Sequence, residues 1–167
     1  MRTFPVTCLI GPRQCGKTTL ARSLERDHYS DLENPGHMRL FDTPQLNLEK
    51  LDGTIVIDEV QRKPELFALL RYPVERNPSR RYLILGSASL EILRESSQTL
   101  AGRIGFHELT PFTVDLTGEQ HVDTLWFRGG FPRSFLAESD ETSSLWLDNY
   151  IKTFLDWCQN CFFPGAF

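Results

Sequence analysis

Residues 11–18 read GPRQCGKT, a glycine followed by four residues, a second glycine, a lysine and a hydroxyl residue. The glycines let the backbone turn so that successive N–H groups face phosphate oxygens, and a following helix adds the positive end of its dipole. Lys17 then supplies a positive charge for the β and γ phosphates of ATP, and the Thr18 hydroxyl can bind the Mg²⁺ that bridges them. We predict a loop that binds ATP through Gly11, Pro12, Arg13, Gln14, Cys15, Gly16, Lys17, Thr18 and Thr19.

The residues on both sides of this loop support the prediction. Residues 5–10 are mostly apolar or β-favouring, which predicts a short buried strand that ends at Gly11. After Thr18, apolar residues recur at helical spacing at Leu20, Ala21 and Leu24. A strand that runs into a glycine-bearing loop and then into a helix is the context in which phosphate-binding loops occur.

Beyond the loop, apolar strands alternate with helical patterns. We expect strands near residues 29–33, 54–57, 82–85 and 104–109, and helices around residues 45–51, 64–73, 89–95 and 143–154. Pro64 stands where a helix can start, and Pro73 is expected to end that helix. Strands separated by helices predict crossover connections and a parallel sheet. The expected fold class is α/β, a three-layer sandwich of the P-loop NTPase type with helices on both faces of the sheet and a short C-terminal helical segment.

Two acids, Asp58 and Glu59, follow the apolar strand at residues 54–57. In P-loop enzymes the first such acid holds Mg²⁺ through its water shell, and the next can polarise the attacking water. The carboxyl end of such a strand faces the nucleotide site. We therefore predict a metal site at Thr18 and Asp58 and a catalytic role for Glu59. A strand end that is merely solvated is the competing interpretation.

Two further residues are weaker candidates for a catalytic role. Ser87 follows the strand at residues 82–85 and could place a hydroxyl between the acid pair and the γ phosphate. Ser89, close by, fits a helix N-cap instead. Arg103 precedes the last expected strand and could direct its guanidinium at a phosphate of this chain or of a neighbouring one. A surface ion pair is the alternative for Arg103.

Composition excludes several classes of protein. The net charge of −4 gives no basic field of the kind that a dedicated duplex binder carries. No apolar run reaches the roughly 18 residues that span a bilayer, and the N-terminus lacks a signal sequence. A cytoplasmic location without a membrane partner is therefore expected. The four cysteines are too scattered for a disulfide framework and are expected to be reduced.

Cysteines and aromatic residues offer additional candidates. Cys158 and Cys161 form a CxxC pair, but no second pair accompanies them, so an accidental spacing is favoured over a metal or redox site. Cys15 lies in the loop before a helix N-terminus, which favours its thiolate, so oxidation there could block ATP. Aromatic residues are grouped around two glycines, where core packing is favoured over stacking on nucleic-acid bases. These residues are Trp126, Phe127, Phe131 and Phe135.

Several segments taken in order resemble one known family. GPRQCGKTTL, IVIDEVQRKPELF, RYLILGSAS, LAGRI and FRGGFP are similar to motifs of the AAA-type ATPases of bacteria and archaea that carry an N-terminal AAA domain and a C-terminal domain of uncharacterised function. The resemblance runs from Val6 to about Phe154. It implies that the strand before Ser87 lies between the loop strand and the Asp58 strand. It also implies that Glu59 is the catalytic base, Ser87 a sensor, and Arg103 an arginine finger acting across a subunit interface.

The resemblance also bears on the organisation of the chain. Similar family members continue beyond the helix at residues 143–154 into a second domain, whereas the last stretch here, DWCQNCFFPGAF, shows no recognisable periodicity. A shortened copy is therefore expected, with an AAA-type ATPase core at residues 1–118 and the start of a linker or C-terminal region at 119–167. Gln61 and Arg62 follow Glu59 in the matching motif, but the sequence assigns them no chemistry.

Three functions remain open. The leading one is an ATPase that uses Mg²⁺ and ATP to drive a conformational change in a partner or attached domain. A nucleotide-binding switch without hydrolysis and a small-molecule kinase are the alternatives. A homo-oligomer, and a protein or nucleic-acid partner, are also left open by the sequence.

Overall fold

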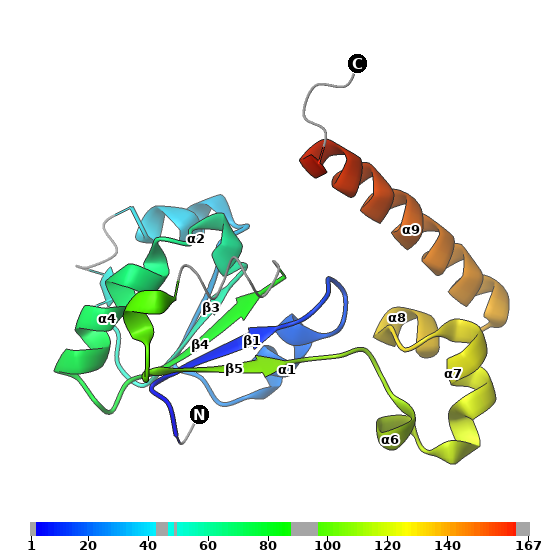
Figure 1. The fold of residues 1–167 in the computed structure, drawn as a ribbon, viewed down its shortest axis with the longest axis horizontal. Coiled ribbons are helices and arrows are strands. Elements are labelled where there is room, and N and C mark those ends of the chain that lie inside the picture. Colours follow the sequence, from blue (N-terminus) through cyan, green and yellow to red (C-terminus); the bar gives the residue numbers. More distant parts are fainter. Residues whose placement is uncertain (1–2, 43–46, 49, 88–96, 163–167) are drawn as a thin grey trace. The chain divides into compact units, whose positions relative to one another are not determined.

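The computed structural model describes residues 3–42, 47–48, 50–87 and 97–162, with side chains up to residue 154 (Figure 1). The chain divides into two compact units, Met1–Thr110 and Pro111–Phe167. The helix expected at residues 89–95 lies outside the described residues, as do positions 45, 46 and 49 of the one expected around 45–51. Residues just after Thr110 pack within the second unit: Phe112 donates its N–H to the Gly130 carbonyl at 2.7 Å. The functional division expected at residue 118 stays a prediction.

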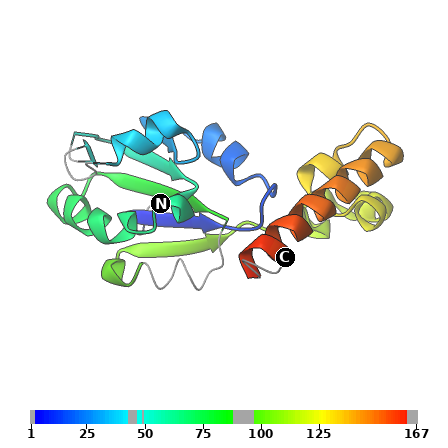
Figure 2. The same ribbon diagram turned by 90° about the horizontal axis from the view of Figure 1, so that it is seen from above.

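The first unit is built on a five-stranded parallel sheet (Figures 1 and 2). Its strand order is β2-β3-β4-β1-β5. The strands are β1 (Val6–Ile10), β2 (His28–Asp31), β3 (Thr54–Asp58), β4 (Arg81–Gly86) and β5 (Ile104–Glu108). The parallel sheet and the position of β4 between β1 and β3 are both as expected. Because every strand runs the same way, the carboxyl ends of β1, β3 and β4 share one edge of the sheet.

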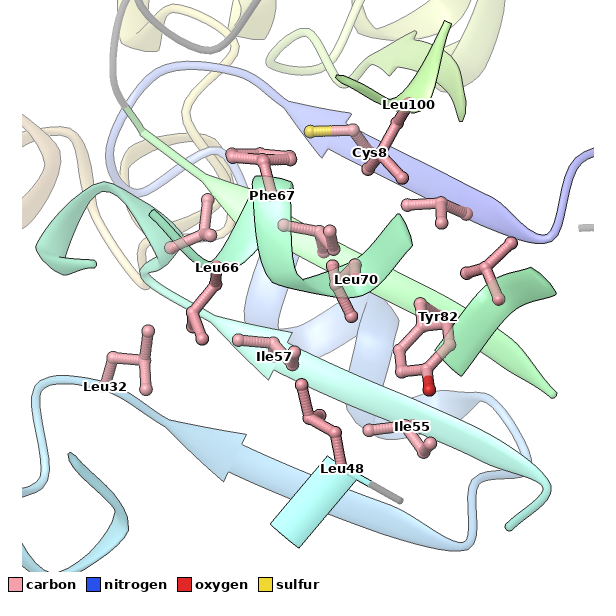
Figure 3. Close-up of a cluster of buried hydrophobic side chains, with 14 of the residues drawn as sticks. Cys8, Leu32, Leu48, Ile55, Ile57, Leu66, Phe67, Leu70, Tyr82 and Leu100 are labelled. Atoms are coloured by element: carbon pink, nitrogen blue, oxygen red, sulfur yellow. The ribbon is translucent and has the colours of Figure 1, made fainter. Parts of the chain in front are cut away.

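Alternating side chains of the central strands pack against helices on both faces of the sheet. On one face, Ile57 and Tyr82 contact a cluster that includes Phe67 of α4 (Leu66–Arg76) (Figure 3). On the other face, Val56 and Leu83 pack with Ala21 of α1 (Lys17–Ser23). Burial on both faces explains why these strands read as continuous apolar runs. The expected three-layer sandwich is confirmed.

Two helices differ from the sequence-based expectation. No helix was predicted for the polar stretch that forms α2 (Pro35–Leu40). The helix forms there because the Asn34 side chain accepts from the Gly36 N–H at 2.8 Å and Pro35 stands at the first helical position. Pro73 was expected to end its helix, and this was wrong. α4 continues through Pro73 to Arg76, and the Asn77 N–H then bonds the Pro73 carbonyl at 3.2 Å.

The second unit is helical. It contains α6 (Val114–Thr117), α7 (Val122–Arg128), α8 (Pro132–Phe135) and α9 (Asp140–Phe162), with a short 3-10 turn at Glu119–His121. α9 extends beyond the expected bounds at both ends. Ser134 and Ser143 share a buried hydrogen bond of 2.7 Å that ties α8 to α9. Among the described helices, none combines the length and the apolar character needed to cross a membrane.

The four aromatic residues singled out in the sequence separate into two pairs. Phe131 contacts the rings of Trp146 and Tyr150, and Phe135 contacts Phe112. These two therefore pack against other aromatic rings of the second unit while remaining half-buried. Trp126 and Phe127 are instead 91% and 57% exposed.

Candidate functional site

The loop between β1 and α1 has a backbone that glycine alone accommodates at its first position. Gly11 has a φ of 153°, and a Cβ there would lie 2.2 Å from the Leu109 carbonyl oxygen. Gly16 adopts a left-handed conformation with a φ of 104° at the N-cap of α1. These two positions allow the chain to leave a buried strand, turn sharply and enter a helix. The glycines of the motif therefore have the conformational role that the sequence predicted.

Lys17 lies back over this loop. Its side chain is 6% exposed, and Nζ donates to the carbonyls of Gly11 and Pro12, both at 2.8 Å. A buried ammonium group requires such acceptors. The charge of Lys17 is therefore held at the start of the loop. Cys15 is also buried, with its Sγ 3.9 Å from Nζ of Lys17.

The structure brings together the two residues predicted to hold Mg²⁺. Thr18 Oγ1 donates to Asp58 Oδ2 at 2.8 Å, across 40 positions of sequence. Asp58 is 2% exposed, and its Oδ1 accepts from the Glu59 N–H at 2.9 Å. A hydroxyl and a carboxylate are the hard oxygen donors that Mg²⁺ prefers. The donor chemistry of this pair therefore fits the ion.

Tyr29 is a third partner of Asp58 that the sequence did not indicate. Its hydroxyl donates to Asp58 Oδ2 at 2.7 Å, because β2 and β3 pair with Tyr29 opposite Val56. Burial raises the pKa of Tyr29, and the hydrogen bond to Asp58 raises it further, so the hydroxyl keeps its proton. The guanidinium groups of Arg22 and Arg26 lie 5.4 and 5.5 Å from the ring centroid. The contact between Tyr29 and Asp58 can be predicted only when the pairing register of β2 and β3 is known.

The carboxyl ends of β3 and β4 are joined by a polar cluster of Glu59, Gln61 and Ser87. Ser87 Oγ donates to Glu59 Oε2 at 3.3 Å. Gln61 Nε2 donates to the same oxygen and to Ser87 Oγ, the latter at 2.8 Å. Two of the three predicted catalytic residues, Glu59 and Ser87, therefore lie in direct contact. Gln61, to which the sequence assigned no chemistry, connects them.

Glu59 has an unusual backbone for its residue type. Its φ of 57° and ψ of 43° are left-handed, a conformation that costs a non-glycine residue roughly 1–2 kcal/mol. The turn starts the 3-10 helix at Val60–Arg62, which carries Gln61 back toward the sheet. Strained backbone of this kind is concentrated at functional sites in proteins.

Comparison with known proteins fits this arrangement. A family model described as AAA domain matches residues 3–116. The chain belongs to the AAA domain family. The family resemblance expected from the sequence is thereby confirmed, and membership makes the chain a nucleotide-binding, ATPase-like protein.

Two curated mycobacterial proteins are similar to this AAA-domain chain. They are named Uncharacterized protein Mb2031c, of Mycobacterium bovis, and Uncharacterized protein Rv2008c, of Mycobacterium tuberculosis. Each is 47% identical over 157 residues, in an alignment that covers 91% of this chain and 35% of the relative. The chain thus spans about a third of the length of the curated relatives it matches.

Arg103 is the one predicted catalytic residue that this AAA domain does not bring to the loop. It precedes β5, at the amino end of the sheet, where its carbonyl accepts from the Val6 N–H at 3.1 Å. Its guanidinium pairs with Glu75 at 2.8 Å and lines a cavity of about 260 Å³ with Phe4 and Arg81. The loop lies at the opposite edge of the sheet. Within one chain, Arg103 does not belong to the candidate site.

The remaining predicted loop residues are exposed at the rim of the AAA domain's site. This set is Pro12, Arg13, Gln14 and Thr19. Arg13 lies 3.8 Å from Glu33, which also pairs with Arg62 at 3.3 Å. The described part of the chain holds no group of three or more histidine, cysteine or acidic side chains that could bind a metal. The side chains of Cys158 and Cys161 lie outside the described residues.

Proposed function

We propose that the protein binds ATP with Mg²⁺ and hydrolyses it. The observation that carries this proposal is the convergence of Lys17, Thr18, Asp58, Glu59 and Ser87 at one edge of the sheet, where the phosphate loop leaves β1. A loop alone would support binding only. The contact between Thr18 and Asp58 adds a site for the metal, and Glu59, the residue after Asp58, adds a proton acceptor. Hydrolysis needs both.

Each of these residues has a distinct part in the proposed reaction. Lys17 and the loop N–H groups bind the β and γ phosphates, and Thr18 and Asp58 hold Mg²⁺, which neutralises phosphate charge when bound. Glu59 takes a proton from water as the water oxygen forms a bond to the γ phosphorus. The bond from that phosphorus to the β–γ bridging oxygen breaks, and its electron pair leaves with ADP.

Arg103 fits a role only across an interface between copies of the chain. We propose that it supplies positive charge to the phosphates of a neighbouring copy, since its side chain is 38% exposed at the edge opposite its own loop. Specific ATPase activity should then rise with protein concentration. Activity that stays constant over a wide concentration range would exclude this role for Arg103 without affecting the proposed hydrolysis.

Hydrolysis is proposed to drive a conformational change in an attached domain or partner. The matched region makes up 35% of each curated relative, so in those proteins it belongs to a much longer chain. The alternative to an attached domain is a separate partner molecule, either a second protein or a nucleic acid. Stimulation of phosphate release by an added partner would distinguish these cases.

Phosphate release from ATP, with and without Mg²⁺, tests the proposed function. Glu59→Gln should retain ATP binding and lose turnover by about 10²-fold or more, because it removes the proton acceptor alone. Lys17→Ala should weaken binding itself. Glu138→Gln and Lys152→Ala make the same chemical changes at exposed positions and should behave as the wild type.

Three other outcomes would contradict parts of the proposal. Retained ATP affinity in Lys17→Ala would remove the assigned binding site. Binding without turnover in the wild-type protein would favour a nucleotide-dependent switch. ATP turnover that depends on an added small alcohol would favour a kinase.

A further inference from the structure

Gln61 occupies a central place in the polar cluster at the ends of β3 and β4. Its side-chain amide contacts Ser87 at two atoms and Glu59 at a third. Gln61, Glu59 and Ser87 are each half-buried, so these contacts are partly shielded from water. Shielding strengthens hydrogen bonds to a charged group relative to those on an open surface.

The orientation of the Gln61 amide follows from its partners. The Ser87 N–H can only donate, so the atom that faces it at 3.2 Å must be the carbonyl oxygen Oε1. The NH₂ group then faces the Ser87 hydroxyl and the Glu59 carboxylate. Ser87 Oγ accepts a hydrogen bond from Gln61 Nε2 and donates one to Glu59 Oε2. The three side chains thus form a closed ring of hydrogen bonds.

The ring treats the two oxygens of Glu59 differently. Both side-chain donors, from Gln61 and Ser87, bind Oε2. Oε1 carries no hydrogen bond from any residue that the structure describes. A carboxylate that is tied at one oxygen and open at the other is oriented to accept a proton at the open oxygen.

We propose that Gln61 is a positioning residue for the proposed hydrolysis. It fixes the Glu59 carboxylate so that Oε2 is tied to Ser87 and Oε1 is left to take the proton of water. This inference rests on the proposed function. The left-handed backbone of Glu59 starts the turn that makes the ring possible, because it places Gln61, two residues later, back against Glu59.

A glutamate side chain without such contacts samples several rotamers, and misplacement of a reacting group by about 1 Å can cost about 10²-fold in rate. Loss of Gln61 should therefore lower kcat. It should leave KM nearly unchanged, because the ring does not include the loop residues that bind ATP. A purely structural role would instead lower ATP affinity and stability together.

Gln61→Glu is the sharpest test, since it keeps the shape of the side chain but replaces both donors and sets a carboxylate against Glu59. We expect kcat to fall about 10- to 100-fold while KM stays within about threefold. Retained ATP affinity would show that the variant is folded. Gln98→Glu makes the same substitution at an exposed position of the same unit and should keep wild-type kcat.

A double-mutant cycle supplies a second readout. If the ring acts as one unit, Gln61→Ala and Ser87→Ala should each lower kcat, and the double variant should be little slower than the slower single variant. Unchanged kcat in Gln61→Glu, a rise in KM alone, or multiplicative losses in the cycle would overturn the inference. If the wild-type protein binds ATP without turnover, the proposed hydrolysis itself fails, which is a distinct result.

Discussion

Asp58 is a buried carboxylate that owes its place to three donors. Thr18 and Tyr29 donate to Oδ2, and the Glu59 N–H donates to Oδ1. An ionised group with 2% exposure is tolerated only when its oxygens are bonded in this way. The residue proposed to hold the metal is thus fixed by the phosphate loop on one side and by β2 on the other.

Removal of the Tyr29 hydroxyl should destabilise the fold. Tyr29→Phe deletes a donor to a charged group, so we expect the free energy of unfolding to fall by about 1.5–3 kcal/mol. Urea denaturation measures the change. Tyr72→Phe is the matched control, because Tyr72 is 48% exposed and should shift stability by less than about 0.5 kcal/mol. Equal effects of the two substitutions would contradict a stabilising bond to Asp58.

At this scale, the sequence predicted those site residues whose spacing carries the signal. Lys17, Thr18, Asp58 and Glu59 belong to motifs with fixed positions along the chain, and family resemblance added the sensor role of Ser87. The contacts of Tyr29 depend on which residue of β3 lies opposite it. Those of Gln61 depend on a left-handed turn that glutamate rarely adopts. Neither feature leaves a pattern in a single sequence.

At the scale of elements, the strands were the most predictable part. β1, β3 and β4 are buried on both faces, so they appear as short, uninterrupted apolar runs. α2 could have been predicted from Asn34 and Pro35, an N-cap followed by a proline at the first helical position. The end of α4 could not be predicted from the sequence, because packing of its apolar side against the sheet keeps the helix intact past Pro73.

Pro73 should limit the stability of α4. A proline inside a helix costs about 3 kcal/mol relative to alanine, and loss of two buried methylenes offsets about 1.6 kcal/mol of that. Pro73→Ala should therefore raise the free energy of unfolding by about 1 kcal/mol, as measured in urea. Pro64→Ala, before the first residue of the helix, should give no gain. A loss of stability in Pro73→Ala would mean that ring packing outweighs the helical hydrogen bond.

At the scale of the whole molecule, the two units can be observed separately. All three tryptophans, Trp126, Trp146 and Trp157, belong to the second unit, whereas the phosphate loop and the whole sheet belong to the first. Tryptophan fluorescence therefore reports unfolding of the second unit. Amide hydrogen exchange in β1 and β4, followed across a urea titration, reports on the first.

Mg²⁺ and ATP should stabilise the first unit selectively. At about 100 times its Kd, a ligand adds about 2.7 kcal/mol to the state that binds it. We expect the midpoint seen by hydrogen exchange in β1 and β4 to rise more than the midpoint seen by fluorescence. Lys17→Ala should abolish the rise. Equal shifts of both midpoints would contradict selective stabilisation of the first unit.

The strand order has a consequence for how the protein is made. β1 leaves the ribosome first, yet its partners are β4 and β5, with Val6 opposite Tyr82 and Ile104. Until those segments are synthesised, the apolar strand VTCLI has no neighbours, and such unpaired strands favour aggregation. The phosphate loop therefore cannot adopt its folded conformation before β4 and β5 have been synthesised. A nascent chain that stalls before Arg81 should depend on chaperones and should not yet hold nucleotide.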